Sequence, residues 1–167
     1  SNEFDNLLPD YLRFIKGVVD ASDLPLNVSR EILQENPQLE KIRNNLVNRI
    51  LKTLAQIKEK DFEKFSGLHE EFGTLLKEGL QSDWSNKEKI ADLLLFESST
   101  KEPGEKTTLA NYIENMSDDQ EEILYLAGEN RGSVEKAPYL ESFKAEGKEV
   151  LLMIDPIADF VIPQLME

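Results

Sequence analysis

Cysteine is absent from this 167-residue chain, and histidine and tryptophan occur once each, at His69 and Trp84. Without cysteine the chain cannot form disulfides, zinc–thiolate sites or thiol nucleophiles. A chain without disulfides fits a reducing compartment, so we expect a cytoplasmic protein. Long apolar runs are missing too. None approaches the roughly 20 residues that span a bilayer, and we expect no membrane segment.

Positive charge is also scarce. The chain has 19 lysine and arginine residues against 33 aspartate and glutamate residues, which gives a net charge of −14. Proteins that bind nucleic acid along a basic face need the opposite balance, so we expect no nucleic-acid partner. In so acidic a chain, a single arginine that faces a phosphate group stands out.

The N-terminus carries no signal peptide, because Ser1-Asn2-Glu3 introduces neither a basic region nor an apolar stretch. The chain also begins without methionine. Ser1-Asn2 resembles the residues that a protease leaves behind, so we expect a fragment of a longer protein. The composition, 40% hydrophobic and 31% charged, is typical of a globular protein with one ordinary domain or two small ones.

The chain divides into three regions with different patterns of apolar and polar residues, and the first region covers residues 1–35. After an amphipathic start, Val18 and Val19 predict a short strand. The Leu24-Pro25-Leu26 sequence must be extended, because a residue before proline is pushed out of the α region. Ser29 can cap a short helix that runs from residue 30 to about 35.

The second region, residues 36–82, is predicted to be helical. Asn36 can cap a helix and Pro37 suits its first position. Apolar residues then recur every three or four positions and predict a helix of about six turns. The pattern continues from Phe62 to Leu80 through one or two further helices, interrupted near Gly67 and Gly73. We expect a small helical bundle or hairpin. The first stripe contains Leu39, Ile42, Leu46, Val47, Ile50, Leu51, Leu54 and Ile57.

The third region, residues 83–167, alternates helices and strands. Capping-box spacing predicts helix starts at Ser85, ahead of the apolar residues Ile90, Leu93, Leu94 and Leu95, and again at Ser117. Thr108 can cap a helix of its own. Residues 101–106 form a polar loop. Residues 123–127 and 150–154 are each predicted to be a buried strand, with a helix over residues 133–146 that breaks at Pro138 and stops at Gly147.

Strand, helix, strand and a last helix after Asp155-Pro156 imply parallel pairing with a right-handed crossover. The predicted fold class is therefore α/β with large helical content. We expect the tail of an αβ layer, then the helical bundle or hairpin, then a small αβα lobe with a short, mainly parallel sheet.

Several candidate sites have a simpler structural explanation. The glycine-flanked loop at residues 128–133 lies where a phosphate loop would, but its glycine spacing is one residue short and its lysine is missing, so an ordinary turn is the better interpretation. His69 is expected to face solvent on a helix. Trp84 is expected to be a packing residue, and the apolar stripe is expected to be core rather than a partner-binding face. Adjacent acid pairs, at 70–71, 118–119 and 121–122, point to different helix faces and make poor catalytic or metal pairs.

Arg30 is the strongest candidate for a functional residue. An arginine in the first turn of a helix lies against the unfavourable end of the helix dipole. One interpretation is a surface arginine paired with Glu31 or Glu35. The other is a guanidinium held out toward an anion that another surface brings, since arginine stays charged and grips phosphate oxygens in a planar fork. Gln34, one turn on, lies on the same helix face.

The sequence Leu24-Pro25-Leu26-Asn27-Val28-Ser29-Arg30-Glu31-Ile32-Leu33-Gln34 carries a resemblance as well. It resembles the middle domain of the heat-shock protein 90 chaperone family, in particular its bacterial members. The similarity covers essentially the whole chain, and so long an ordered series is far more specific than one short motif. It runs through residues 9–20, 23–34, 44–47, 63–65, 108–112, 125–129, 134–140 and 150–157.

The resemblance implies a three-part, ATP-dependent molecular chaperone that assists protein folding. An N-terminal domain binds ATP with Mg²⁺, the middle domain completes the ATPase, and a C-terminal domain forms a homodimer. The family's middle domain offers an arginine to the ATP γ-phosphate with a glutamine in support, and these roles fall on Arg30 and Gln34. By the same resemblance, residues 1–35 are the tail of a large αβ subdomain with the catalytic loop, 36–82 a helical linker subdomain and 83–167 a small αβα subdomain.

The partners that the resemblance implies are the protein's own N-terminal nucleotide-binding domain, unfolded client proteins and the heat-shock protein 70 system. The nucleotide pocket itself belongs to the N-terminal domain, so this chain alone is expected to bind no cofactor and to hydrolyse no ATP. The alternative function is a non-catalytic interaction module that binds client or co-chaperone proteins.

Overall fold

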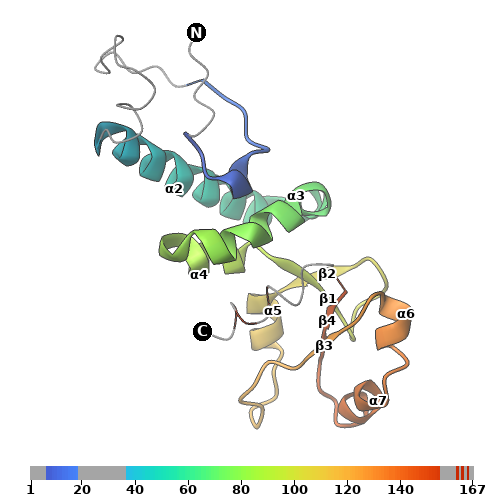
Figure 1. The fold of residues 1–167 in the computed structure, drawn as a ribbon. Coiled ribbons are helices and arrows are strands. Elements are labelled where there is room, and N and C mark those ends of the chain that lie inside the picture. The colour runs from blue at the N-terminus through green and yellow to red at the C-terminus, as the bar shows by residue number, and fades with distance from the viewer. Residues whose placement is uncertain (1–6, 19–36, 155–160, 162, 164, 166–167) are drawn as a thin grey trace.

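The computed structural model describes residues 7–18, 37–154, 161, 163 and 165. Two long helices, α2 and α3, lie at one end of the molecule, and a small lobe built on a four-stranded sheet lies at the other (Figure 1). Within the described residues, no helix combines the length and the apolar character that crossing a membrane requires. The mixed α/β fold class predicted from the sequence is confirmed.

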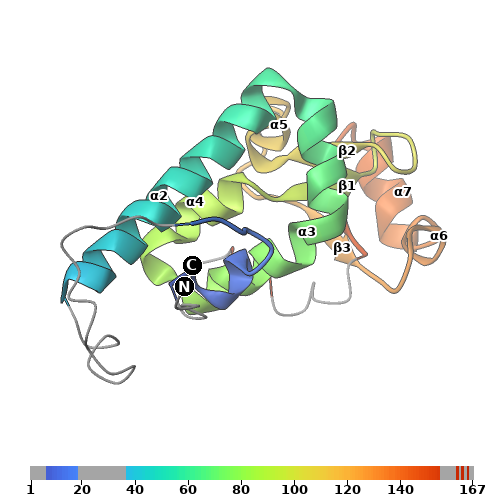
Figure 2. The same cartoon turned by 90° about the horizontal axis from the view of Figure 1, so that it is seen from above.

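The two long helices form the predicted hairpin. Helix α2 (Pro37–Lys60) begins at its proline, and its 24 residues confirm the expected length of about six turns. Only Asp61 separates it from α3 (Phe62–Ser82), and this aspartate caps α3 by accepting a hydrogen bond from the Lys64 amide at 3.1 Å. Figure 2 shows the two helices meeting at their junction and running apart from there. Their facing apolar residues form the core as expected, with Val47, Leu51, Leu54, Phe65, Leu76 and Leu80 buried.

Helix α3 is continuous, so the predicted interruptions near Gly67 and Gly73 are wrong. Glycine within a helix costs about 1 kcal/mol relative to alanine, but the buried apolar residues on the same helix offset that cost. At Gly73 the small residue is needed for packing, because a Cβ there would lie 2.6 Å from the His69 ring.

The N-terminal part of the described chain packs on α3. A short 3-10 helix, η1 (Asp10–Leu12), buries Tyr11 and Leu12 completely. Of the strand predicted at residues 18–19, only Val18 is described. Val18 is fully exposed and belongs to no strand, so the prediction is wrong at this residue. A strand needs a partner, and the described part of the chain provides none for Val18.

The small lobe contains a sheet with the strand order β2-β1-β4-β3. Strand β1 (Leu95–Ser98) pairs antiparallel with both β2 (Lys106–Thr108) and β4 (Leu151–Met153), and only β3 (Tyr125–Ala127) pairs parallel with β4. The sheet is therefore mixed, and the prediction of a mainly parallel sheet is wrong. The predicted parallel pair exists, but β1 and β2 form a hairpin that the sequence did not reveal.

The missed hairpin has a simple physical cause. Leu93, Leu94 and Leu95 continue the apolar pattern that begins at Ile90, so the sequence predicts that they belong to the preceding helix. In the structure, helix α4 (Lys87–Asp92) stops after six residues, Leu93 and Leu94 connect it to the sheet, and Leu95 begins β1. The predicted polar loop at residues 101–106 lies in the hairpin turn up to residue 105, and β2 begins at Lys106. Within the turn, Gly104 adopts a φ of +89°.

The helices around the sheet agree in part with those predicted from the sequence. Thr108 caps α5 (Leu109–Glu114) as predicted, accepting from the Asn111 amide at 3.1 Å. A 3-10 helix, η2 (Trp84–Asn86), precedes α4. The capping-box spacing at Ser117 produces a turn closed by the Gln120 amide rather than a helix. The predicted crossover helix is split into α6 (Arg131–Val134) and α7 (Pro138–Ala145), with the break at Pro138 and the stop at Gly147, whose φ is +74°.

The two strands of the parallel pair differ in burial. All three residues of β4 are buried, as predicted, but Tyr125 and Ala127 of β3 are exposed, so the prediction of a buried β3 is wrong. Strand β3 lies at the edge of the sheet, a position that its apolar sequence does not reveal. Most of the helix predicted after Asp155-Pro156 lies outside the described residues.

Candidate functional site

Arg30 and Gln34, with the extended Leu24-Pro25-Leu26 sequence before them, lie outside the described residues. The structure does describe the elements on both sides of this segment. Residues 7–18 precede it and α2 follows it from Pro37. How these two elements are held decides where a loop between them can be presented.

The preceding element is fixed to the end of α3 through Tyr11. The Tyr11 hydroxyl donates a hydrogen bond to an Asp83 carboxylate oxygen at 2.8 Å. Burial, followed by this bond to a carboxylate, raises the pKa of Tyr11 far above its ordinary value, so the phenol stays protonated and remains a donor. Its ring lies against Gly79, where a Cβ would come within 2.9 Å of the ring carbons.

Two further contacts fasten the same element along α3. The two terminal nitrogens of the Arg13 guanidinium donate hydrogen bonds to the two carboxylate oxygens of Glu78, at 2.6 and 3.0 Å. This interaction lowers the pKa of Glu78. The Phe14 ring stacks on Phe72, with centroids 4.5 Å apart and planes within 10°. Helix α2 packs against α3 as well. One helix therefore holds both flanks of the segment that contains Arg30.

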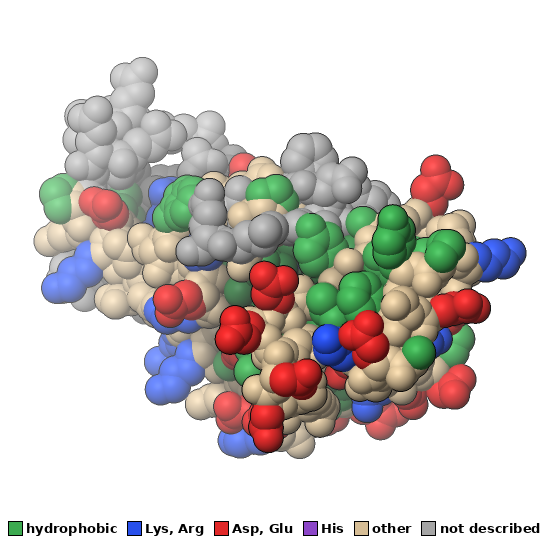
Figure 3. All heavy atoms as spheres, turned by 90° about the horizontal axis from the view of Figure 1, so that it is seen from below, with side chains coloured by type: hydrophobic (Ala, Val, Ile, Leu, Met, Phe, Trp, Pro, Cys, Tyr) green, Lys and Arg blue, Asp and Glu red, His purple; other side chains and the backbone are tan. Residues whose placement is uncertain are grey.

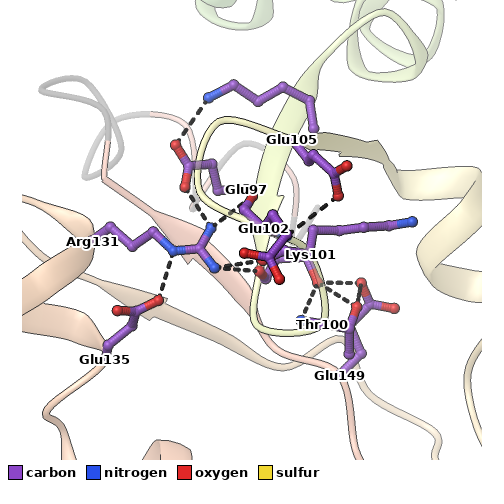
Figure 4. A network of polar contacts seen from close by, with 10 residues as sticks. Glu97, Thr100, Lys101, Glu102, Glu105, Arg131, Glu135 and Glu149 are labelled. Carbon is purple, nitrogen blue, oxygen red and sulfur yellow. Dashed lines mark hydrogen bonds and ion pairs between the residues drawn. The ribbon is translucent and has the colours of Figure 1, made fainter.

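A second polar cluster, in the small lobe, surrounds Arg131 (Figure 4). The Arg131 guanidinium donates to Glu97 at 2.8 Å and to Glu135 at 2.7 Å, and to the Lys101 carbonyl at 2.6 Å. It also reaches the carbonyls of Ser98 and Glu102 at 3.4 Å. These bonds tie the start of α6 to the β1–β2 hairpin.

The charges in this cluster are largely shielded from water. The side chains of Arg131 and Glu97 are 14% and 10% exposed, and Lys106 approaches Glu97 at 3.3 Å. Burial alone would raise the pKa of Glu97, but the bonds from Arg131 and Lys106 outweigh it and hold that pKa below its ordinary value. With its donors engaged inside the lobe, Arg131 acts as a structural clamp and does not offer its guanidinium to a ligand.

The loop before α6, weighed above as a phosphate loop, forms an ordinary βα turn. Asn130 caps α6 by accepting from the Ser133 amide at 2.9 Å. The sequence could have shown the Arg131–Glu135 pair from its four-residue spacing. The Arg131–Glu97 pair spans 34 residues, and only the folded lobe brings it together.

His69 was expected to face solvent, and that prediction is wrong. It is buried on α3, and its Nε2 accepts a hydrogen bond from the Leu95 amide at 3.1 Å. A histidine between apolar positions can join the core where a neighbouring strand supplies a donor, and here β1 supplies one. His69 also borders a cavity of about 270 Å³ between α3 and the sheet, lined in addition by Lys77, Glu97, Lys106, Leu152 and Met153.

Trp84 was expected to be a packing residue, and this prediction is also wrong. Its side chain is 62% exposed, and the Lys87 ammonium lies 4.9 Å from the ring centroid. The tryptophan lies in η2, directly after the Asp83 that holds Tyr11. Among the described residues, no group of three or more histidine, aspartate or glutamate side chains is arranged to hold a metal ion.

Comparisons with known proteins agree with the resemblance found in the sequence. A family model described as Hsp90 protein matches residues 1–167. The chaperone protein HtpG of Geobacter sulfurreducens is 48% identical over 163 residues, and that of Nocardia farcinica is 46% identical over 164 residues. Each alignment covers 98% of this chain and 25% of the relative, so the chain spans about a quarter of the length of these bacterial proteins.

A solved structure supports the same assignment. The middle domain of a heat shock protein from Plasmodium falciparum superimposes with a TM-score of 0.81 at 33% sequence identity. The match covers 98% of this chain and 62% of that one. The expected family and its bacterial character are thereby confirmed. The chain belongs to the Hsp90 family and corresponds to part of its middle domain.

Proposed function

We propose that this chain is the part of an ATP-dependent chaperone that supplies an arginine to ATP bound in a neighbouring N-terminal domain. In this proposal ATP is bound together with Mg²⁺ in the N-terminal domain. Arg30 stabilises the charge that develops on the γ-phosphate of this ATP, and Gln34 supports the loop. Guanidinium suits this role, because catalysis of phosphoryl transfer depends on positioning and charge stabilisation. The match to the Hsp90 family over residues 1–167 is the observation that carries the proposal.

The anchoring of the flanking elements supports this role. Tyr11, Arg13 and Phe14 fasten the preceding element to α3, and α2 packs on the same helix. These contacts fix the two ends of the segment that contains Arg30 relative to one helix. Stabilisation of charge in a transition state depends on positioned groups, and fixed ends favour such positioning.

The test is Arg30→Ala in the full-length chaperone. We expect the ATP turnover number to fall several-fold or more while ATP affinity stays nearly unchanged, because the arginine acts on the transition state. Arg49→Ala on the exposed face of α2 is the matched control and should leave turnover unchanged. Unchanged turnover in Arg30→Ala would refute the catalytic role.

The partners and location that fit this proposal are those of a chaperone machine: unfolded client proteins, a heat-shock protein 70 system, a homodimer and the cytoplasm. A second function, a protein-interaction module, is favoured by large apolar side chains at the surface. Tyr139, Trp84 and Ile113 are 72%, 62% and 56% exposed. If client binding falls in variants of these residues while Arg30→Ala leaves both binding and turnover intact, the module alone is the better account.

A further inference from the structure

His69 is the single histidine of the chain, and it links helix α3 to the sheet. Charged side chains of both signs gather at the molecular surface, as the face seen from below shows (Figure 3), whereas His69 is 7% exposed. The His69 Nε2 accepts a hydrogen bond from the Leu95 amide at 3.1 Å. A ring nitrogen that accepts a hydrogen bond carries no proton, so this contact requires a neutral imidazole.

The bond from Leu95 to His69 takes the place of a bond between strands. The Ser99 amide donates to the Val150 carbonyl at 2.9 Å, and backbone groups alternate in direction along a strand, so the Leu95 amide faces the same side as that of Ser99. Continued by two residues, the register of β1 and β4 would place Ile154 opposite Leu95. The Leu95 amide bonds to the imidazole instead, so the side chain of His69 ties α3 to the first residue of β1.

The surroundings of the His69 ring disfavour a positive charge on it. Among the described residues, the charged side chains that line the cavity beside the ring are Glu70, Lys77, Glu97 and Lys106. Glu70 is exposed, so water screens its charge, and the charge of Glu97 is compensated by its ion pairs with Arg131 and Lys106. Burial adds to this, because a group removed from water resists taking up a charge.

We propose that His69 is a pH-sensitive joint between α3 and the sheet, which holds while the imidazole is neutral and opens when the imidazole takes up a proton. Protonation of Nε2 places two N–H donors face to face, so the hydrogen bond from Leu95 is lost. A buried donor without an acceptor is costly, and the protonated ring therefore favours local separation of β1 from α3. This inference does not depend on the role of Arg30.

The single histidine makes the joint directly measurable in this 167-residue chain. In an NMR titration we expect the midpoint of the imidazole signal to lie below about 6.5, the pKa of an unperturbed histidine. The control is His69→Gln, whose side-chain oxygen can accept the Leu95 amide but does not titrate. Below about pH 6.5 the folding equilibrium constant of the wild type should fall relative to that of His69→Gln, by about tenfold per pH unit until the folded midpoint is reached, because unfolding takes up one proton. A midpoint at or above 6.5, or the same pH dependence in both proteins, would overturn the proposal.

Amide exchange distinguishes a local joint from a general loss of stability. The matched amide is that of Leu151 in the same sheet, which donates to the Leu124 carbonyl at 2.9 Å and not to the ring. Between pH 7 and pH 5 we expect the protection factor of the Leu95 amide to fall by about tenfold more than that of the Leu151 amide. A loss at Leu95 no larger than that at Leu151 would overturn the proposal. This measurement uses the unchanged chain, so it decides even if His69→Gln does not fold.

Discussion

At the scale of the residue, Arg131 shows how one side chain can join parts of a lobe that are distant in sequence. It links α6 to Glu97 on β1 and to carbonyls in the β1–β2 turn. Removing it in Arg131→Ala leaves Glu97 shielded and takes away the shorter of the two ion pairs that Glu97 forms with Arg131 and Lys106. Breaking such a pair is costly, and we expect the free energy of unfolding to fall by about 2–4 kcal/mol in urea titrations.

Arg13 provides the comparison for this prediction. It also forms a bidentate pair, with Glu78, but the two side chains are 49% and 43% exposed. Water and salt screen such pairs, so Arg13→Ala should cost much less than Arg131→Ala. Similar losses in the two variants would show that shielding does not distinguish the pairs and would contradict our account of the clamp.

The protonation of Glu97 gives a prediction on pH. Its pKa is lowered in the folded protein, so the carboxylate contributes stability above its unfolded pKa of about 4.5, and that contribution is lost as pH falls through the lower folded pKa. Glu97→Gln cannot lose a charge. The difference in unfolding free energy between the wild type and Glu97→Gln should therefore be constant above about pH 5 and shrink in more acidic solution. A difference that does not vary with pH would contradict the assignment.

At the scale of the element, helix α3 supports the core and also holds the flanks of the Arg30 segment. Two of its three glycines, Gly67 and Gly73, make a matched pair. A Cβ at Gly67 would meet nothing within 4 Å, whereas a Cβ at Gly73 would collide with the His69 ring, which accepts the Leu95 amide. Gly67→Ala should stabilise the protein by about 0.5–1 kcal/mol through helix propensity and chain entropy.

Gly73→Ala should instead destabilise the protein by about 1–3 kcal/mol, because the displaced His69 ring loses its hydrogen bond to β1. Thermal and urea unfolding of the two variants measure both effects. If Gly73→Ala stabilised α3 as much as Gly67→Ala, the ring would not be packed as the structure has it.

The same elements show which features sequence reasoning can reach. The stripe from Leu39 to Ile57 repeats long enough to fix the period of α2, and the Thr108 cap depends on neighbours only three residues away. The run at residues 93–96 is too short to distinguish helix from strand, so β1 was missed. The exposure of β3 and the burial of His69 depend on which strand lies where, and local patterns do not contain that information.

The candidate sites also divide into residues that a local sequence pattern indicates and contacts that only the folded chain brings together. Arg30 and Gln34 were proposed from a local pattern and a family resemblance, and they stay predictions because they lie outside the described residues. The anchors around them, Tyr11 to Asp83 and Arg13 to Glu78, join positions 72 and 65 residues apart. No spacing rule links such distant residues, so they became visible only in the folded chain.

At the scale of the whole molecule, this chain spans about a quarter of the length of the bacterial HtpG chaperones to which it is similar. The helical hairpin and the anchored N-terminal element form one support around α3, and the small lobe is built on the four-stranded sheet. The proposed task of the first part, the presentation of Arg30 to a nucleotide in another domain, can be tested in the full-length protein.

The most direct test of the central claim is single-turnover ATP hydrolysis by the full-length chaperone carrying Arg30→Ala, with the ATP dissociation constant measured on the same preparation. Our account predicts that the rate of ATP cleavage falls several-fold or more while the dissociation constant stays nearly the same, with Arg49→Ala matching the wild type in both. A cleavage rate equal to that of the wild type, or a weaker ATP affinity that accounts for the whole loss, would contradict it.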